Sequence, residues 1–262
     1  MQPKPYRTGA FPGERLTFEV APAAGQVEDD ITWAGGDDPT TGSGRRFSTT
    51  FATGGSKVVT ARDDLASASF AVEICPVNDW LSAAAAFFGP SLDLSRVTVK
   101  QSWAVGGSAG TGWTCNSVVR FKRARRSEDL PVEATLIHEL THVWQHQSGQ
   151  AQLLRGIVEQ AGRLFGRDPY DYGGPEGVRL ATSLRRFKKE GQAQIVMEYW
   201  KSQHGWAEDS QGFGFSSEYV DDLKRLIDEA GIGRRPAMRW TLSKSLDSPL
   251  ASLVNGVLRV VE

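Results

Sequence analysis

The spacing of apolar residues changes once along this chain, near Cys75. Between residues 16 and 74, several short runs alternate apolar and polar residues, as strands with one buried face do. Clusters of glycine, proline and aspartate, which favour turns, separate these runs. After residue 76 the apolar residues recur at intervals of three and four, the spacing of helices. The sequence therefore predicts an α+β protein, with an all-β domain at residues 1–75 and a mainly helical domain at residues 76–262.

The first domain is predicted to be a small β-sandwich. Its strands are expected at residues 16–20, 31–33, 47–51 and 70–74. The stretch TWAGGDDPTTGSGRRFSTTFATGGSKVVTA, which begins at Thr32, resembles bacterial Ig-like modules. In such modules a strand tryptophan is followed by a glycine-rich turn, an F-x-T-x-F strand and a closing V-V-T-A strand. The resemblance covers roughly residues 8–75 and implies an Ig-like sandwich.

The second domain is predicted to combine two strands with five helices. A glycine-rich segment at residues 104–112 joins the two strands. The first helix is alanine-rich and is expected to have Asp79 as its N-cap and Gly89 as its stop. Glycines near the ends of three later helices are C-cap candidates. The predicted strands are residues 97–99 and 117–121, and the predicted helices are residues 79–88, 133–147, 150–165, 180–203 and 216–230.

Charge and hydropathy argue against two classes of partner. The formal net charge of -1 gives no overall field that would draw the chain to nucleic acid or to an anionic membrane. The basic run RFKRARR at residues 120–126 is interpreted as a solvated strand end and loop. No apolar stretch reaches the roughly 18 residues that span a bilayer, and the N-terminus lacks a signal-peptide core. We therefore expect cytoplasmic synthesis without Sec export, and neither nucleic acid nor membrane as a partner.

Histidine is rare in this chain and clustered. Three of the four histidines, at positions 138, 142 and 146, lie within nine residues of a predicted helix. His138 and His142 are one turn apart on one face, so both can bind a zinc ion about 2.0–2.1 Å away. Glu139 is placed to hold and deprotonate the water that completes the zinc shell, which is the H-E-x-x-H pattern. His146 is rejected as a ligand because it lies about 12 Å along the helix from His138.

Cysteine offers no competing metal site. Cys75 and Cys115 are the only two, too few for a disulfide scaffold or a four-cysteine zinc site. We predict that both are unpaired buried thiols, and the alternative is a single Cys75–Cys115 disulfide. The third zinc ligand must come from elsewhere in the chain. In gluzincins it is a glutamate on a downstream helix, and here Glu190 and Glu198 are both available, with spacing alone unable to separate them.

Several motifs together resemble one known family. LIHELTHVWQHQSG at residues 136–149, PYDY at 169–172 and KEGQAQIVMEYW at 189–200 resemble the zinc-peptidase core domain found with bacterial contractile injection systems and polymorphic-toxin loci. That family shows H-E-L-x-H-V-x-Q, then Y-x-Y, then E-Q-Q-A-x-I-V-x-D-Y-F. With the lead-in FFGPSLDLSRVTV, the match spans residues 77–205, and residues 206–262 form a C-terminal extension. The match favours Glu190 as the third ligand, although Gly191 and Glu198 depart from the usual glutamine and aspartate.

The resemblance implies a zincin-like metallopeptidase domain that cleaves protein or peptide substrates. Zinc would be held by His138, His142 and Glu190, and Glu139 would act as the general base. It also implies injection-system or toxin components as partners, and export by a non-Sec route such as a contractile injection system. The developing oxyanion needs one further donor. The candidates for that donor are Tyr172, Tyr170 and His204.

A second hypothesis belongs to a different class of protein. The chain would then be a non-catalytic assembly or adaptor protein of an injection or toxin system, with a structural zinc ion. Glu139 separates the two hypotheses. A structural zinc site has a closed shell of four ligands and no use for a carboxylate between two of them, whereas a catalytic site needs an open position and a base.

Overall fold

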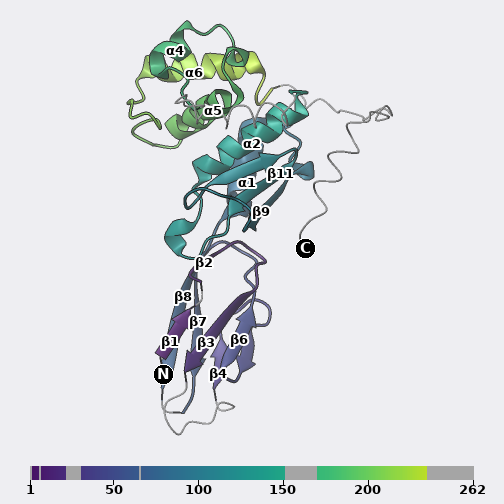
Figure 1. Cartoon of the computed structure of the whole chain (residues 1–262), viewed down its shortest axis with the longest axis vertical. Helices are drawn as coiled ribbons and strands as arrows, with labels where there is room; N and C mark the ends of the chain where they lie inside the picture. The colour runs from purple at the N-terminus through teal and green to yellow at the C-terminus, as the bar shows by residue number, and fades with distance from the viewer. Residues whose placement is uncertain (1, 6, 22–30, 65, 151–169, 235–262) are drawn as a thin grey trace, which may run out of the picture.

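The computed structural model describes residues 2–5, 7–21, 31–64, 66–150 and 170–234. Within these ranges the chain is α+β, with eleven β-strands and five α-helices. The strands of residues 2–74 gather at one end of the molecule and the helices at the other (Figure 1). None of the described helices has the length and apolar character needed to cross a membrane.

Two sheets make up the N-terminal part. One has the strand order β1-β3-β6 and the other β2-β8-β7-β4-β5. Phe18 and Phe70 meet between the sheets with ring centroids 5.6 Å apart, and Trp33 stacks on Phe47 at 5.7 Å. These aromatic pairs belong to one buried cluster that joins the sheets face to face. The strands are β1 (Gln2–Pro5), β2 (Gly9–Ala10), β3 (Leu16–Ala21), β4 (Thr32–Ala34), β5 (Thr41–Ser43), β6 (Arg46–Thr49), β7 (Gly55–Arg62) and β8 (Ser67–Ile74).

The four strands predicted in this part correspond to β3, β4, β6 and β8. Alternation located them because one face of each is buried in the core while the other meets solvent; β8, for example, alternates exposed and buried residues along almost its whole length. The Ig-like type of the sandwich stays a prediction.

A third sheet supports the helices. Its order is β10-β11-β9, from β9 (Thr98–Ser102), β10 (Gly112–Cys115) and β11 (Val118–Lys122), with β11 parallel to β9 and antiparallel to β10. The sequence predicted β9 and β11 but assigned no strand at β10. A tight hairpin joins β10 to β11, and Asn116 adopts a φ of 55° in it. β10 was missed because it is four residues long and follows directly on a glycine-rich segment.

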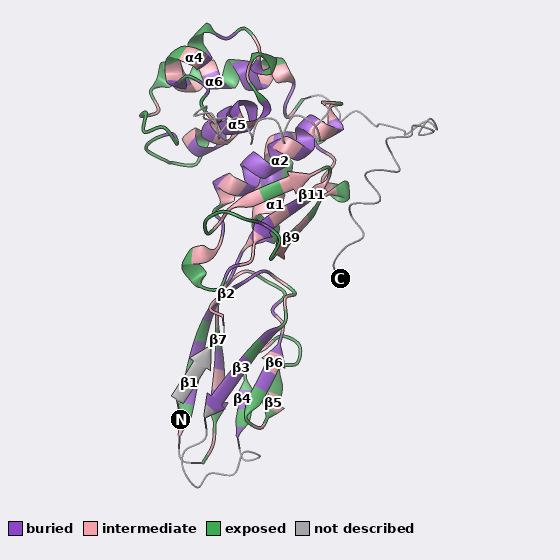
Figure 2. Ribbon diagram, viewed as in Figure 1, coloured by how far each residue is buried: buried purple, intermediate pink, exposed green. Residues whose placement is uncertain are grey.

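The helices are α1 (Val77–Phe88), α2 (Glu133–Gln147), α4 (Gly174–Leu180), α5 (Lys189–Gln203) and α6 (Ser217–Ala230). Helix α2 lies against β10 and β11 on one side and against α5 on another. Both α2 and α5 consist mostly of buried residues (Figure 2). Leu136, Leu140 and Val143 are fully buried and fix α2 in the core. A buried helix therefore carries the H-E-x-x-H pattern.

Two predictions about helix ends are wrong. Helix α1 begins at Val77, with Pro76 in the N-cap position, so Asp79 lies inside the first turn, where its charge favours the helix dipole. The helix predicted at residues 180–203 begins too early, because α5 starts at Lys189 and Leu180 is the last residue of α4, a helix that was not predicted. Helices α2 and α6 have the predicted bounds to within one residue. Of the helix predicted at residues 150–165, residues 151–165 lie outside the described residues.

The two parts meet through the segment before β3. Strand β2 pairs in parallel with β8, and the Thr8 amide donates to the Arg125 carbonyl at 3.0 Å. Phe11 is not part of the cluster between the sheets. It belongs to the buried cluster of the helical part, where its ring lies 5.9 Å from that of Phe121. The N-terminal part thus contributes side chains to the core that surrounds α2.

Candidate metal centre

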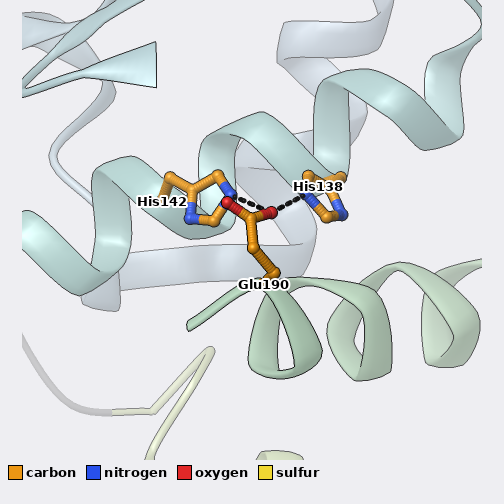
Figure 3. A group of neighbouring side chains, drawn as sticks. All are labelled: His138, His142 and Glu190. Atoms are coloured by element: carbon orange, nitrogen blue, oxygen red, sulfur yellow. Dashed lines mark hydrogen bonds and ion pairs between the residues drawn. The ribbon is translucent and has the colours of Figure 1, made fainter. Parts of the chain in front are cut away.

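His138 and His142 extend from the same side of α2 toward the first turn of α5. Their placement follows from the helical repeat, because residues four apart lie one above the other. Glu190 is the second residue of α5, and its carboxylate lies between the two imidazole rings (Figure 3). The side chains of His138, His142 and Glu190 are 9%, 13% and 16% exposed. Two helices, 52 residues apart in sequence at this point, thus bring three potential ligands together in a largely buried site.

The distances in this group fit a metal ion. Glu190 Oε2 lies 3.2 Å from Nε2 of His138 and 3.2 Å from Nε2 of His142. Ligands about 2.0–2.2 Å from a tetrahedral zinc ion lie about 3.3–3.5 Å from one another. One ligand atom from each residue falls within 4.8 Å of the others, so one ion can contact all three. These residues could hold a metal ion.

His142 and Glu190 shift each other's pKa. Burial alone would lower the pKa of His142, but hydrogen bonding to Glu190 and the charges of Glu190 and Glu139 outweigh it and raise the pKa to about 9. Burial likewise opposes ionisation of Glu190, yet its hydrogen bonds to His138 and His142 hold its pKa well below the ordinary value. Without a metal, Glu190 is therefore an anion paired with a protonated His142 at neutral pH.

Glu139 faces the sheet. The Thr114 hydroxyl of β10 donates to Glu139 Oε2 at 2.6 Å, and the Glu139 side chain is buried between α2 and β10. A Cβ atom on Gly112 would lie 2.6 Å from Cγ of Glu139 and 2.7 Å from its Oε1, closer than real Cβ contacts allow. Gly112 and Thr114 are two residues apart and share one face of β10. The strand thus leaves room for the carboxylate at one position and binds it at the other.

The far side of the His142 ring is also held. Its Nδ1 lies 2.9 Å from Oε1 of Gln145, which is fully buried. The amide nitrogen of Gln145 donates to the Lys189 carbonyl at 3.0 Å, so its oxygen is the atom that faces the ring. Nδ1 therefore carries a proton, and the Nε2 lone pair of the neutral ring is directed at the candidate metal position.

The other predicted ligand candidate lies elsewhere. The Glu198 carboxylate is fully buried on α5, where it forms an ion pair with Lys201 at 2.9 Å and accepts from the Ser210 amide at 3.0 Å. It is not part of the group formed by the two histidines and Glu190. His146 is also outside this group, as the helical spacing required, and nearby Arg96 and Lys189 add to burial in lowering its pKa.

The three predicted oxyanion donors are dispersed. Tyr170 is adjacent to the group, with its ring centroid 5.9 Å from that of His138. The Tyr172 hydroxyl donates to Asp209 at 2.6 Å and lies 2.9 Å from the Tyr219 hydroxyl, in a buried network. Burial and these hydrogen bonds raise the pKa of Tyr172 far above its ordinary value.

His204 is the C-cap of α5, and its ring stacks on Trp200 with centroids 3.7 Å apart. Fourteen residues of helix, about 21 Å, separate it from Glu190 at the first turn. Among the contacts of the described residues, Tyr170 is the one of the three candidates whose side chain meets a member of this group.

Three residues of the site have no role in the sequence prediction: Gly112, Thr114 and Gln145. Gln145 could have been found, because it lies one turn after His142 on the same helix. Gly112 and Thr114 could not, because the contact to Glu139 joins residues about 25 positions apart and β10 itself was not predicted.

The two cysteines are free, as predicted, although Cys115 is only half-buried. Burial, more than the nearby Glu73 charge, raises the pKa of Cys75 to about 12.

Comparison with known proteins gives one partial match. No protein family matches the chain. A segment of 143 residues is 29% identical to the type VI secretion system spike protein VgrG2b of Pseudomonas aeruginosa. The similarity covers 52% of this chain but only 14% of that protein. The chain is thus similar to a small portion of a much longer spike protein.

Proposed function

We propose that this chain is a zinc-dependent peptidase of a bacterial injection system, with a gluzincin-like site of His138, His142 and Glu190. The observation that carries the proposal is the convergence of these three ligand atoms, with Glu139 buried one residue away from the first ligand. A zinc ion bound there would supply a Lewis acid that polarises the scissile carbonyl and acidifies a water molecule. The similarity to a secretion spike protein supports the injection-system setting.

In this proposal Glu139 moves the proton. One carboxylate oxygen, Oε2, accepts a hydrogen bond from the Thr114 hydroxyl. The other oxygen, Oε1, would take a proton from the attacking water and later deliver it to the leaving amine. His142 keeps its orientation because Nδ1 is bound to Gln145. Tyr170, beside His138, is the candidate that remains close enough to donate to the developing oxyanion.

The substrate would be an extended peptide that runs along β10. Among the described strands, β10 is paired only with β11, so its other edge has backbone groups available for a further strand. A peptide that adds to this edge gains main-chain hydrogen bonds without a fixed side-chain sequence. Because Gly112 and Thr114 of the same strand contact Glu139, this edge is next to the proposed base.

The alternative is a non-catalytic, zinc-containing assembly or adaptor protein. The sequence comparison taken alone favours this alternative, because the relative is named as a spike protein and not as an enzyme. The buried Glu139 favours the peptidase. A carboxylate held against the strand by Thr114 is not needed to close a structural zinc shell, whereas a hydrolase requires a base at that place.

The decisive experiment compares wild-type protein with Glu139→Gln. Both should bind about one zinc ion per chain, since the variant keeps all three ligands. In a digest of a peptide library read by mass spectrometry, the wild type should cleave and the variant should lose at least about a hundredfold in rate. Zinc-loaded wild type that cuts no peptide or protein would favour the adaptor. Equal cleavage by both proteins would remove Glu139 from the mechanism.

A further inference from the structure

Two glutamines of the motifs meet, although 47 residues separate them in sequence. Gln145 ends the H-E-L-x-H-V-x-Q motif on α2, and Gln192 follows Glu190 by two residues on α5. Both are buried, with 0% and 4% of their surface exposed. Nε2 of Gln145 lies 3.2 Å from Oε1 of Gln192 and donates to it. The proposed peptidase chemistry gives Gln192 no role.

Their hydrogen bonds form a continuous chain between the two metal-ligand helices. His142 Nδ1 donates to Gln145 Oε1, and Gln145 Nε2 donates to the Lys189 carbonyl and to Gln192 Oε1. Gln192 in turn donates from Nε2 to the Phe187 carbonyl at 2.9 Å, just before α5 begins. The Lys189 carbonyl belongs to the peptide bond that leads into Glu190. One amide therefore contacts the ring of one ligand and the backbone that carries another.

We propose that Gln145 and Gln192 form a positioning pair that fixes His142 and Glu190 relative to each other before the metal binds. This inference rests on the proposed metal centre. The pair keeps the Nδ1 proton bound to Gln145, so that Nε2 is the nitrogen presented to the metal, and it stops the ring from turning about its axis. It also holds the first turn of α5, and with it Glu190, against α2. Partners that orient metal ligands in this way typically contribute a factor of about 10–100 to metal affinity.

A purely structural role is the competing explanation, and the chain offers a matched control. Gln147 lies on α2 two residues after Gln145 and is also buried, at 6% exposure. Its side chain accepts from the Asp93 amide at 2.7 Å and donates to the Asp93 carbonyl at 3.1 Å. Loss of Gln147 therefore leaves part-buried backbone groups unpaired, much as loss of Gln145 does, but the Gln147 side chain has no hydrogen bond to a candidate ligand.

The test measures zinc affinity of the full chain by competition with a chromogenic chelator. Gln145→Met should weaken zinc binding by about 10–100-fold, whereas Gln147→Met should stay within about threefold of wild type. Melting temperatures of the zinc-free proteins show that both variants fold and how far each is destabilised. Gln192→Met keeps every ligand and both histidine contacts, so it provides a second variant if Gln145→Met does not fold. It should show a smaller loss in the same direction.

The outcomes separate this inference from the function on which it rests. Wild type that binds zinc while Gln145→Met and Gln192→Met bind it equally well would overturn the positioning pair and leave the metal centre intact. An equal loss in the Gln147→Met control would also overturn it, since general destabilisation would then explain the effect. Wild type that binds no zinc would overturn the proposed metal centre and this inference together.

Discussion

The proton on His142 competes with a metal ion for the same nitrogen. Nδ1 is already bound to Gln145, so the proton that metal binding must displace is the one on Nε2, next to Glu190. The His142 pKa of about 9 means that this proton is present at neutral pH in the metal-free protein. Metal binding should therefore release a proton, and affinity should depend on pH in a defined range.

We predict that zinc affinity rises by about tenfold per pH unit between pH 7 and 8.5 and levels off near pH 9. Chelator competition at several pH values would measure this, with the pH dependence of the chelator corrected. An affinity that does not change over this range would contradict the proton competition.

Above neutral pH, the stability of the metal-free protein should fall as the pH rises, whereas zinc affinity should increase. The raised His142 pKa contributes stability that is complete below 6.5, the ordinary value, and is lost as the pH rises through 9. The lowered Glu190 pKa contributes stability present above its ordinary value of 4.5 and lost as the pH falls. Urea unfolding of the metal-free protein should therefore show this contribution at its largest between pH 4.5 and 6.5. His142→Ala, which removes the pair, should flatten the decline above pH 6.5.

Gly112 tests the placement of Glu139. A Cβ atom there would lie 2.6 Å from Glu139 Cγ, so Gly112→Ala should push the carboxylate away from its position beside Thr114. If Glu139 is the base, peptide cleavage should fall by about a hundredfold while zinc content stays at one per chain. Gly106→Ala is the control, because a Cβ at Gly106 meets no atom within 4 Å. Unchanged cleavage in Gly112→Ala would show that the position of this carboxylate does not matter.

Local spacing located part of the site and failed where the contacts are long-range. The helical repeat alone placed His138, Glu139 and His142 on α2, because their relation lies within one turn. Glu190 and Glu198 could not be separated by spacing, since each lies on α5. Tertiary contacts separate them, because Glu198 is paired with Lys201 on its own helix and Glu190 lies against the histidines.

Among the elements, the segment between α4 and α5 shows why the helix predicted at residues 180–203 began too early. The apolar spacing of residues 180–203 is helical throughout, yet α4 ends at Leu180. Arg225 of α6 donates to the carbonyls of Ala181 at 2.7 Å and Val178 at 3.1 Å, which satisfies acceptors at the helix end. That partner lies 44 residues further along the chain, so no local pattern could indicate it. Helix α6, which has its own Ser216 and Gly231 caps, was predicted correctly.

Arg225→Met should therefore destabilise the junction of α4, α5 and α6. Removal of its charged donors leaves part-buried carbonyls without their partner, which costs about 1–3 kcal/mol of unfolding free energy. Arg179→Met is the matched control. Arg179 forms an exposed pair with Glu176, and pairs of that kind contribute little. Urea unfolding of both variants would measure the difference, and equal stabilities would show that Arg225 does not hold the end of α4.

At the scale of the whole molecule, the change of apolar spacing near Cys75 marks a real change of architecture, but the contacts do not stop there. Arg7 donates to the Ala124 carbonyl at 3.0 Å and to Gln101 at 2.9 Å, beside the sheet that supports α2. Phe11 packs in the same core as Phe121. Sequence periodicity identifies the elements on each side of the boundary, whereas side chains that cross it are visible only in three dimensions.

These crossing contacts make a truncated protein informative. Residues 77–262 contain His138, His142 and Glu190 and every contact between α2 and α5, so we predict that this fragment binds one zinc ion with an affinity within a few fold of the full chain. It should be less stable, because loss of a buried phenylalanine such as Phe11 alone costs about 3–5 kcal/mol. Thermal unfolding and zinc titration of the fragment would measure both effects, and Phe11→Ala in the full chain should reproduce part of the lost stability with zinc binding unchanged. A folded fragment that cannot bind zinc would show that the N-terminal part is needed to shape the metal centre, and the two parts would then act as one unit.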